Sequence, residues 1–145
     1  MMKMSVNVLY TAKAFATGGR DGYAQTEDGS FKVKLATPTE LGGDGNGNNP
    51  EQIFAAGYSA CFLGAMKFFA SQNKHLSVPE DAKVSTSVGI GPRDAGGFGI
   101  TAAIEVSLPG VDAAAAQELV NGAHEQICPY SHATRNNVDV KVSIV

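Results

Sequence analysis

A run of fourteen residues without a formal charge, Ile53 to Met66, constrains the fold of this 145-residue chain more than any other feature. The sequence Asn49-Pro50-Glu51-Gln52 just before it has the composition of a helix start, with a capping Asn, Pro at the first position and Glu at the positive end of the helix dipole. Apolar side chains then point in every direction around the helix, and such a helix has to be buried on all sides. The run is short for a membrane span and is broken by Gly57, Ser59 and Gly64, so the sequence predicts a central core helix.

Alternation of apolar and polar residues predicts the strands around this helix. The alternation is clear over residues 31–35, 84–90, 98–108 and 138–144, and weaker over residues 6–16 and 23–26. Asp28-Gly29 is typical of a hairpin turn, and an amphipathic helix is predicted from near Asp112 to about Cys128, where Pro129 ends it. The predicted order is β-β-β-α-β-β-α-β. We therefore expect one α+β domain over residues 1–145, with mostly antiparallel sheets around a long buried central helix.

Composition and charge limit the classes of binding partner and the cellular compartment expected for this chain. The chain has 11 Lys and Arg residues and 14 Asp and Glu residues, which gives a net charge of −3, and it has no basic run. A surface for nucleic acid or for an anionic membrane is therefore not favoured. The N-terminal residues hold no apolar run long enough for a signal peptide, so a cytoplasmic location is expected. A purely structural disulfide would be unusual in that reducing compartment, so Cys61 and Cys128 are either buried spectators or a chemical pair.

The residues alone leave both interpretations of these cysteines open. Cys61 lies in the middle of the predicted central helix, where a free cysteine often behaves as a small hydrophobe. Cys128 lies at a predicted helix C-terminus, whose negative dipole end disfavours a thiolate. If one cysteine is a nucleophile, we expect it to be Cys61 together with an added cation. Arg20, between glycines, is the candidate cation or a solvent-facing turn residue, and the helix dipole alone already explains Glu51.

Metal, nucleotide and serine-hydrolase chemistry are weaker hypotheses. His124 and Cys128 stand four residues apart, a spacing that two zinc ligands can use, but only Cys61, His75 and His132 remain to complete a tetrahedral site. The glycine-rich segment 42–47 lacks the ending of a phosphate-binding loop, and the chain contains no Gly-x-Ser-x-Gly elbow. Zinc binding, nucleotide hydrolysis and serine-hydrolase chemistry are therefore not favoured.

The central helix also predicts an oligomer. A helix that is apolar all round needs more partner surface than six short strands and one amphipathic helix provide. A homodimer with this helix near the interface would supply that surface.

Four sequence blocks, taken in order, closely resemble the organic hydroperoxide resistance (Ohr) proteins of the OsmC/Ohr superfamily. They are Thr17-Gly18-Gly19-Arg20-Asp21-Gly22, Asn49-Pro50-Glu51-Gln52, Gly57-Tyr58-Ser59-Ala60-Cys61-Phe62 and Cys128-Pro129-Tyr130-Ser131. The resemblance spans nearly the whole chain, and the first and last blocks are similar to the Ohr branch rather than its OsmC sister. His132 and Asn136 depart from the Asn and Gly expected after the last block, which bears on the mobility of that segment.

The resemblance implies a thiol-dependent peroxidase that is an intertwined homodimer without metal or haem. It assigns Cys61 as the peroxidatic cysteine, Cys128 as the resolving cysteine, Arg20 as the partner of thiolate and peroxide, and Glu51 as the carboxylate that orients Arg20. Cys61 would pass through a sulfenic acid to a disulfide with Cys128, which an external dithiol, on the family pattern a lipoylated protein, reduces. An apolar pocket would favour alkyl or fatty-acid hydroperoxides. Four aromatic residues are expected to line it: Phe54, Tyr58, Phe62 and Phe98.

These assigned roles place one constraint on the dimer. Glu51 and Cys61 are ten residues apart on one helix, a rise of about 15 Å, which no single guanidinium bridges. Two antiparallel central helices would bring Glu51 of one chain to Cys61 of the other, unless the helix breaks at Gly57. The alternative to an enzyme is a non-catalytic ligand-binding or redox-sensing stress protein.

Overall fold

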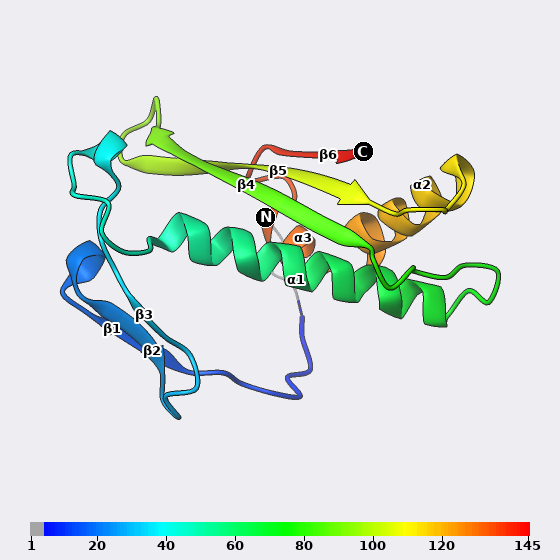
Figure 1. The fold of residues 1–145 in the computed structure, drawn as a ribbon, viewed down its shortest axis with the longest axis horizontal. Coiled ribbons are helices and arrows are strands. Elements are labelled where there is room, and N and C mark those ends of the chain that lie inside the picture. The colour runs from blue at the N-terminus through cyan, green and yellow to red at the C-terminus, as the bar shows by residue number, and fades with distance from the viewer. Residues whose placement is uncertain (1–4) are drawn as a thin grey trace. The chain divides into compact units, whose positions relative to one another are not determined.

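The computed structural model describes residues 5–145, and the chain forms two compact units, Met1–Pro50 and Glu51–Val145 (Figure 1). The expectation of one domain over residues 1–145 stays a prediction. The predicted order of elements is confirmed, with one further short helix before the last strand. The fold is α+β, as predicted.

The first unit is a small antiparallel sheet. Its strands are β1 (Ala14–Thr17), β2 (Tyr23–Thr26) and β3 (Lys32–Lys34), in the order β1-β2-β3. The strand predicted over residues 6–16 was too long, because among residues 5–17 only Ala14–Thr17 pairs with a neighbouring strand, β2.

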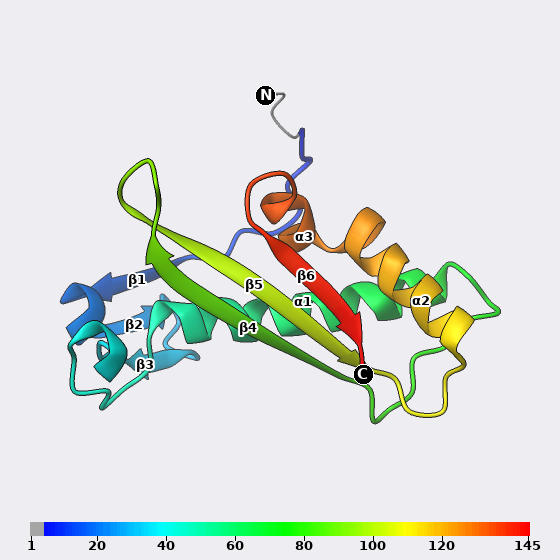
Figure 2. The same cartoon turned by 90° about the horizontal axis from the view of Figure 1, so that it is seen from above.

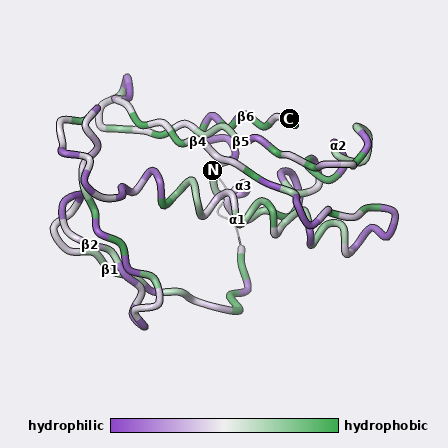
Figure 3. The backbone as a smooth tube through the Cα atoms, in the orientation of Figure 1, coloured by the Kyte–Doolittle hydropathy of each residue, from purple (hydrophilic) through white to green (hydrophobic). Residues whose placement is uncertain are grey.

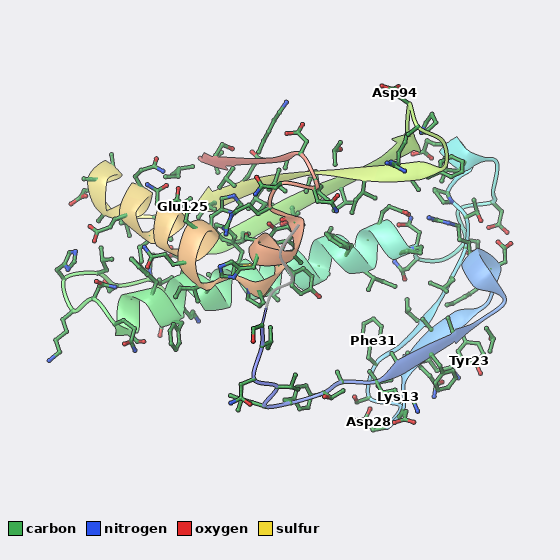
Figure 4. The ribbon with its side chains drawn as sticks, turned by 180° about the vertical axis from the view of Figure 1, so that it is seen from behind. Lys13, Tyr23, Asp28, Phe31, Asp94 and Glu125 are labelled. Carbon is green, nitrogen blue, oxygen red and sulfur yellow. The ribbon has the colours of Figure 1, made fainter. Side chains whose placement is uncertain are left out.

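The predicted hairpin turn after β2 is confirmed and is held by one carboxylate (Figure 4). Asp28 Oδ1 accepts hydrogen bonds from the backbone N–H and the hydroxyl of Ser30 and from the Thr26 hydroxyl. These donors lower the pKa of Asp28 to about 2. Gly29 follows with φ of 74°, a conformation that side chains disfavour.

The second unit packs helices against a three-stranded mixed sheet (Figure 2). Its elements are α1 (Pro50–Ser71, which begins at the last residue of the first unit), β4 (Lys83–Pro92), β5 (Phe98–Ser107), α2 (Ala113–Gly122), α3 (Pro129–Thr134) and β6 (Val140–Ile144). Strands β4 and β5 form a regular antiparallel hairpin from Lys83↔Ser107 to Pro92↔Phe98. β6 pairs parallel to β5, because the intervening helices carry the chain back to the same end of the sheet.

The core lies between α1, the sheet and α2. Figure 3 shows the hydrophobic residues distributed along α1 and the strands. The fully buried large side chains of this core come from three elements: Tyr58, Phe62 and Met66 of α1, Ile104 and Val106 of β5, and Leu119 of α2. The alternation predicted for residues 98–108 is present, since every second residue from Ala102 to Leu108 is buried.

The burial of α1 in the single chain is one-sided, as expected for a helix that needs more partner surface than one chain provides. Within this chain only one face of α1 is buried, because the core of the second unit lies on one side of the helix. Residues on the other face are exposed and recur at steps of four: Gln52, Ala56, Ala60, Gly64 and Phe68. α1 is long and apolar enough to cross a membrane by length and composition, with a mean hydropathy of 1.4. Its side chains nevertheless form part of a folded core, as in a core helix of a globular domain.

The helix predicted from Asp112 to Cys128 is interrupted. α2 ends at Gly122, a π-helical turn covers Ala123–Ile127, and Pro129 begins α3 instead of only ending α2. Asp112 caps α2 by accepting a hydrogen bond from the Ala115 N–H at 2.8 Å. Pattern reading missed the turn because a π turn keeps helical hydrogen bonding and leaves the apolar spacing almost unchanged.

A glycine of α2 lies against an aromatic ring of α1, and this contact yields a prediction. A Cβ atom at Gly122 would lie 2.5 Å from the Phe69 ring. We expect Gly122→Ala to lower the free energy of unfolding by roughly 1–3 kcal/mol, because the partly buried ring has to move. Gly91→Ala is the control, since a Cβ there meets nothing within 4 Å. Equal urea midpoints for the two variants would contradict this packing.

Candidate thiol site

The two cysteines lie side by side in the second unit. Cys61 is in the middle of α1 and partly buried, whereas Cys128 is fully buried between the π turn and α3. Their Sγ atoms are 3.6 Å apart, and both thiols are free. A disulfide requires about 2.05 Å, so a shift of less than 2 Å would join them. The two cysteines are 67 residues apart in the sequence, and this separation alone does not predict their contact.

The π turn sets the direction of Cys128. The Cys128 N–H donates to the Ala123 carbonyl at 2.8 Å, and the backbone then leaves helical geometry with ψ of 116°. Pro129 follows at the first position of α3, and the His132 N–H donates to the Cys128 carbonyl. The sequence predicts Cys128 at a free helix C-terminus. In the structure it lies between two helical segments instead. π turns of this kind occur frequently at functional sites.

Buried hydroxyl groups connect the segments that carry the two cysteines. The Ser131 hydroxyl lies 2.8 Å from the Tyr58 hydroxyl and 2.8 Å from His124 Nδ1, and the Tyr58 hydroxyl also lies 3.1 Å from Thr134 Oγ1. Tyr58 and Ser131 are fully buried and Thr134 nearly so. Tyr58 precedes Cys61 by three residues, and Ser131 follows Cys128 by three. We call these four side chains the hydroxyl network.

His124 completes this network in its neutral form. Burial, followed by the positive charge of Arg135, lowers the pKa of His124, and Glu125 on the same turn only partly opposes them (Figure 4). The imidazole is therefore uncharged at neutral pH and has one donor and one acceptor nitrogen. Arg135 also donates to the His124 carbonyl, so it ties the π turn to the end of α3. The sequence spacing indicates His124 only as a possible zinc ligand and does not predict its hydrogen bond with Ser131.

Burial works against the reactivity of Cys61. It raises the pKa of the Cys61 thiol to about 11, and the neighbouring Cys128 thiol adds to the increase. A hydrogen bond from the Tyr130 backbone N–H acts in the opposite direction. A thiol with this pKa is almost fully protonated at neutral pH, whereas the nucleophile is the thiolate. A reactive Cys61 therefore requires a positive charge, as the sequence had indicated.

Tyr130 covers α1 next to the thiol pair. A Cβ atom at Gly57 would lie 2.8 Å from the Tyr130 hydroxyl, so the missing side chain at Gly57 makes room for this ring. Phe54 packs edge-on against Tyr58 and Tyr130, with ring centroids 6.1 and 5.9 Å apart. Tyr130 belongs to the block Cys128-Pro129-Tyr130-Ser131, but no sequence pattern predicts its contact with α1.

The second unit also contains an open cavity of about 720 Å³. Its lining comes from α1, the β4–β5 hairpin and the end of α3 with the following loop: Phe54, Arg93, Phe98, Gly99, Ile100, Ala133, Thr134, Asn137 and Val138. Two of the four expected pocket residues, Phe54 and Phe98, lie here. Tyr58 and Phe62 are fully buried in the core instead, and the Tyr58 hydroxyl contacts Ser131 and Thr134 of α3.

Glu51 and Arg20 belong to different parts of the chain. Glu51 lies in the first turn of α1, and this helix continues through Gly57 without a break, so its distance along the axis to Cys61 stays at about 15 Å. Arg20 lies in a short 3-10 helix, Gly19–Asp21, of the first unit, where a Cβ at the following Gly22 would collide with the Thr17 carbonyl. The roles of Glu51 and Arg20 stay predictions.

Two further expectations concern metals and the residues after Cys128. Within residues 5–145 the structure contains no group of three or more His, Cys, Asp and Glu side chains that would hold a metal ion. Asn136 adopts φ of 63°, a left-handed conformation that Asn tolerates better than most residues. Asn136 thus adopts a conformation that Gly also favours, and the chain turns after α3 toward β6.

Comparisons with known proteins show the family of the chain. The family model described as OsmC-like protein matches residues 43–143. An organic hydroperoxide resistance protein of Xanthomonas axonopodis pv. citri is 54% identical over 138 residues, covering 94% of this chain and 95% of the relative.

Solved structures agree as well. An organic hydroperoxide resistance protein of Legionella pneumophila matches with a TM-score of 0.88 and 45% identity, covering 95% of this chain and 98% of that one. OhrB of Bacillus subtilis matches with a TM-score of 0.83 and 41% identity, covering 95% and 100%. Sequence blocks, fold and relatives thus point the same way, and this chain belongs to the OsmC-like protein family, among its organic hydroperoxide resistance proteins.

Proposed function

We propose that this protein is a thiol-dependent peroxidase that reduces alkyl or fatty-acid hydroperoxides to alcohols. The observation that carries the proposal is the contact of two free thiols, one partly accessible and one buried, at 3.6 Å. The names of the relatives support organic hydroperoxides as the substrate class. The proposal includes no metal and no bound cofactor.

The first step oxidises Cys61. Its thiolate attacks one peroxide oxygen, so an S–O bond forms and the O–O bond breaks. The departing alkoxide takes up the proton that the thiol released and becomes the alcohol. Cys61 is left as a sulfenic acid. In this proposal Arg20 lowers the high thiol pKa and donates hydrogen bonds to the polarised peroxide, and Glu51 orients Arg20.

The second step resolves the sulfenic acid. The Cys128 sulfur attacks the Cys61 sulfur, an S–S bond forms, and the hydroxyl of the sulfenic acid leaves as water. The fully buried Cys128 is shielded from peroxide in solution, so Cys61 is oxidised first. An external dithiol then reduces the disulfide by exchange, and we propose a lipoylated protein in the cytoplasm as that reductant.

A homodimer is part of the same proposal. The exposed residues Ala56, Ala60 and Gly64 in the middle of α1 have small side chains, whereas the larger exposed residues Gln52, Lys67 and Phe68 lie nearer the ends, so a second helix can approach the middle closely. Two antiparallel copies of α1 would place Glu51 of one chain near Cys61 of the other. A ligand-binding or redox-sensing protein is the alternative, and the high pKa of Cys61 is the observation in its favour.

Substitution of each cysteine by serine separates the oxidation of Cys61 from the formation of the disulfide. We expect Cys61→Ser to consume no organic hydroperoxide, because a hydroxyl is a far poorer nucleophile at neutral pH. Cys128→Ser should consume one equivalent and then stop, with Cys61 carrying one added oxygen atom in the mass spectrum and further oxygen after excess peroxide. Continued turnover of Cys128→Ser with a lipoyl reductant would contradict the resolving role, and peroxide consumption by Cys61→Ser would contradict the proposed function.

The hydroxyl network should act on the second step alone. Tyr58→Phe removes one buried hydroxyl and leaves Ser131 with fewer partners, so the segment carrying Cys128 is held less firmly. We expect unchanged peroxide consumption in the first turnover but slower disulfide formation and more over-oxidation of Cys61, as measured by quenched-flow mass spectrometry. Tyr23→Phe, in the first unit, is the control. Slowing of both steps to the same extent would indicate a general structural defect.

Mixed dimers test the shared site. Inactive Cys61→Ser and Glu51→Ala homodimers are refolded together. If Glu51 serves the partner's thiol, each mixed dimer holds one wholly wild-type site, and peroxidase activity returns in proportion to the mixed dimer. If Glu51 serves the Cys61 of its own chain, every site remains defective and no activity returns.

A further inference from the structure

The cavity of the second unit has a mixed lining with one cation. Phe54, Phe98, Ile100 and Val138 provide apolar surface, and Thr134 and Asn137 provide polar groups. Among the described residues that line it, Arg93 alone is charged. Phe98 is 74% exposed at the edge of the cavity, so its ring is accessible to a ligand. Surface of this kind fits a ligand with an apolar body and one negative charge.

The position of Arg93 is fixed by the β4–β5 hairpin. Its N–H donates to the Gly97 carbonyl at 2.9 Å, and its carbonyl accepts from the Gly96 N–H at 3.0 Å. A Cβ at Gly99 would lie 3.0 Å from Arg93 Cγ, so this glycine leaves room for the arginine stem to lie across the neighbouring strand. The backbone therefore directs the side chain along the hairpin toward the cavity.

The Arg93 guanidinium has donors left for a ligand. Nη1 donates to the Gly96 carbonyl at 3.3 Å, and no carboxylate of residues 5–145 forms an ion pair with this side chain. The adjacent Asp94 lies at the outer tip of the hairpin (Figure 4). A guanidinium has five N–H donors in a planar arrangement that matches a carboxylate.

The cavity and the thiol share one face of α1. Phe54 and Cys61 are seven residues apart, which is almost two full turns and about 10 Å along the helix axis. Tyr130 lies between them, since its ring packs on Phe54 and its backbone N–H bonds to the Cys61 sulfur. An elongated ligand in the cavity would therefore run along this face toward the thiol pair.

We propose that this cavity binds the carboxylate-bearing end of an elongated organic hydroperoxide, with Arg93 as the residue that pairs with the carboxylate. The inference rests on the proposed peroxidase function and adds the residue that selects for an anionic substrate. The hydroperoxide group lies at the other end of the chain, near Cys61. Because Arg93 is exposed, its contribution is modest and is screened by salt.

The test compares a medium-chain hydroperoxide that carries a terminal carboxylate with its methyl ester, at concentrations where both are monomeric. For Arg93→Gln we expect KM for the acid to rise about three- to tenfold at low salt, with kcat for both substrates and KM for the ester unchanged. Arg93→Lys should restore part of the difference. Lys83→Gln, at the far end of β4, removes an equal charge outside the cavity and should change neither KM.

A binding measurement keeps this inference separate from the proposed function. Calorimetry with decanoate and methyl decanoate needs no turnover, and decanoate should bind reduced wild-type protein more tightly than Arg93→Gln. Equal binding of decanoate to both proteins, or an equal loss for acid and ester, would overturn the role of Arg93. Gel filtration completes the test, because dissociation of an oligomer by Arg93→Gln would show that a second copy covers this face, which also overturns the inference. Absence of peroxide turnover in the wild type would instead contradict the peroxidase.

Discussion

The geometry of the thiol pair depends on the hydrogen bonds of Ser131. This fully buried hydroxyl bridges Tyr58 on α1 and His124 on the π turn, at 2.8 Å in each case. Buried hydroxyl groups that lose a partner retain their full desolvation cost, so the network has a strong preference for one arrangement. That arrangement places Cys128 against Cys61. Hydrophobic packing alone would allow α3 to slide on α1, whereas directional hydrogen bonds fix its register.

The same burial creates the main chemical problem of the site. It keeps Cys128 away from solvent and allows the two sulfurs to meet, but it also raises the pKa of Cys61 to about 11. Packing therefore provides proximity, and reactivity has to come from a charge. The backbone N–H of Tyr130 supplies a small part of the compensation. A guanidinium is suited to the rest, because it stays protonated at every relevant pH.

Sequence periodicity predicted much of the fold, because each element has a pattern of its own. The alternation in residues 98–108 and the uncharged run around Cys61 are local signals, and the structure contains both elements. The π turn at Ala123–Ile127 and the parallel pairing of β6 were not predicted, since one leaves the helical spacing unchanged and the other depends on the path of the chain in space. One face of α1 is exposed in the single chain, in line with the expectation that one chain lacks the surface to cover this helix.

The site could be predicted only in part, for a related reason. The blocks around Cys61 and Cys128 marked both thiols, but their contact at 3.6 Å arises from the hydrogen bonds of side chains far apart in the sequence. His124 and Thr134 have no local signature for such a role. Phe54 and Phe98 reach the cavity, whereas Tyr58 and Phe62 lie in the core, although all four are aromatic. Residue type alone does not distinguish these two environments, because aromatic rings occur in both.

Unequal access of the two thiols gives the proposed reaction its direction. A peroxide that reached both cysteines equally would oxidise either one, and an oxidised Cys128 could not act as the resolving thiol. Cys128 has no exposed surface, whereas Cys61 is partly exposed. In the proposed reaction the buried thiol therefore reacts with a sulfenic acid that forms beside it rather than with peroxide from solvent. In this arrangement the packing around Cys128, and not a difference in intrinsic thiol chemistry, sets the order of the two steps.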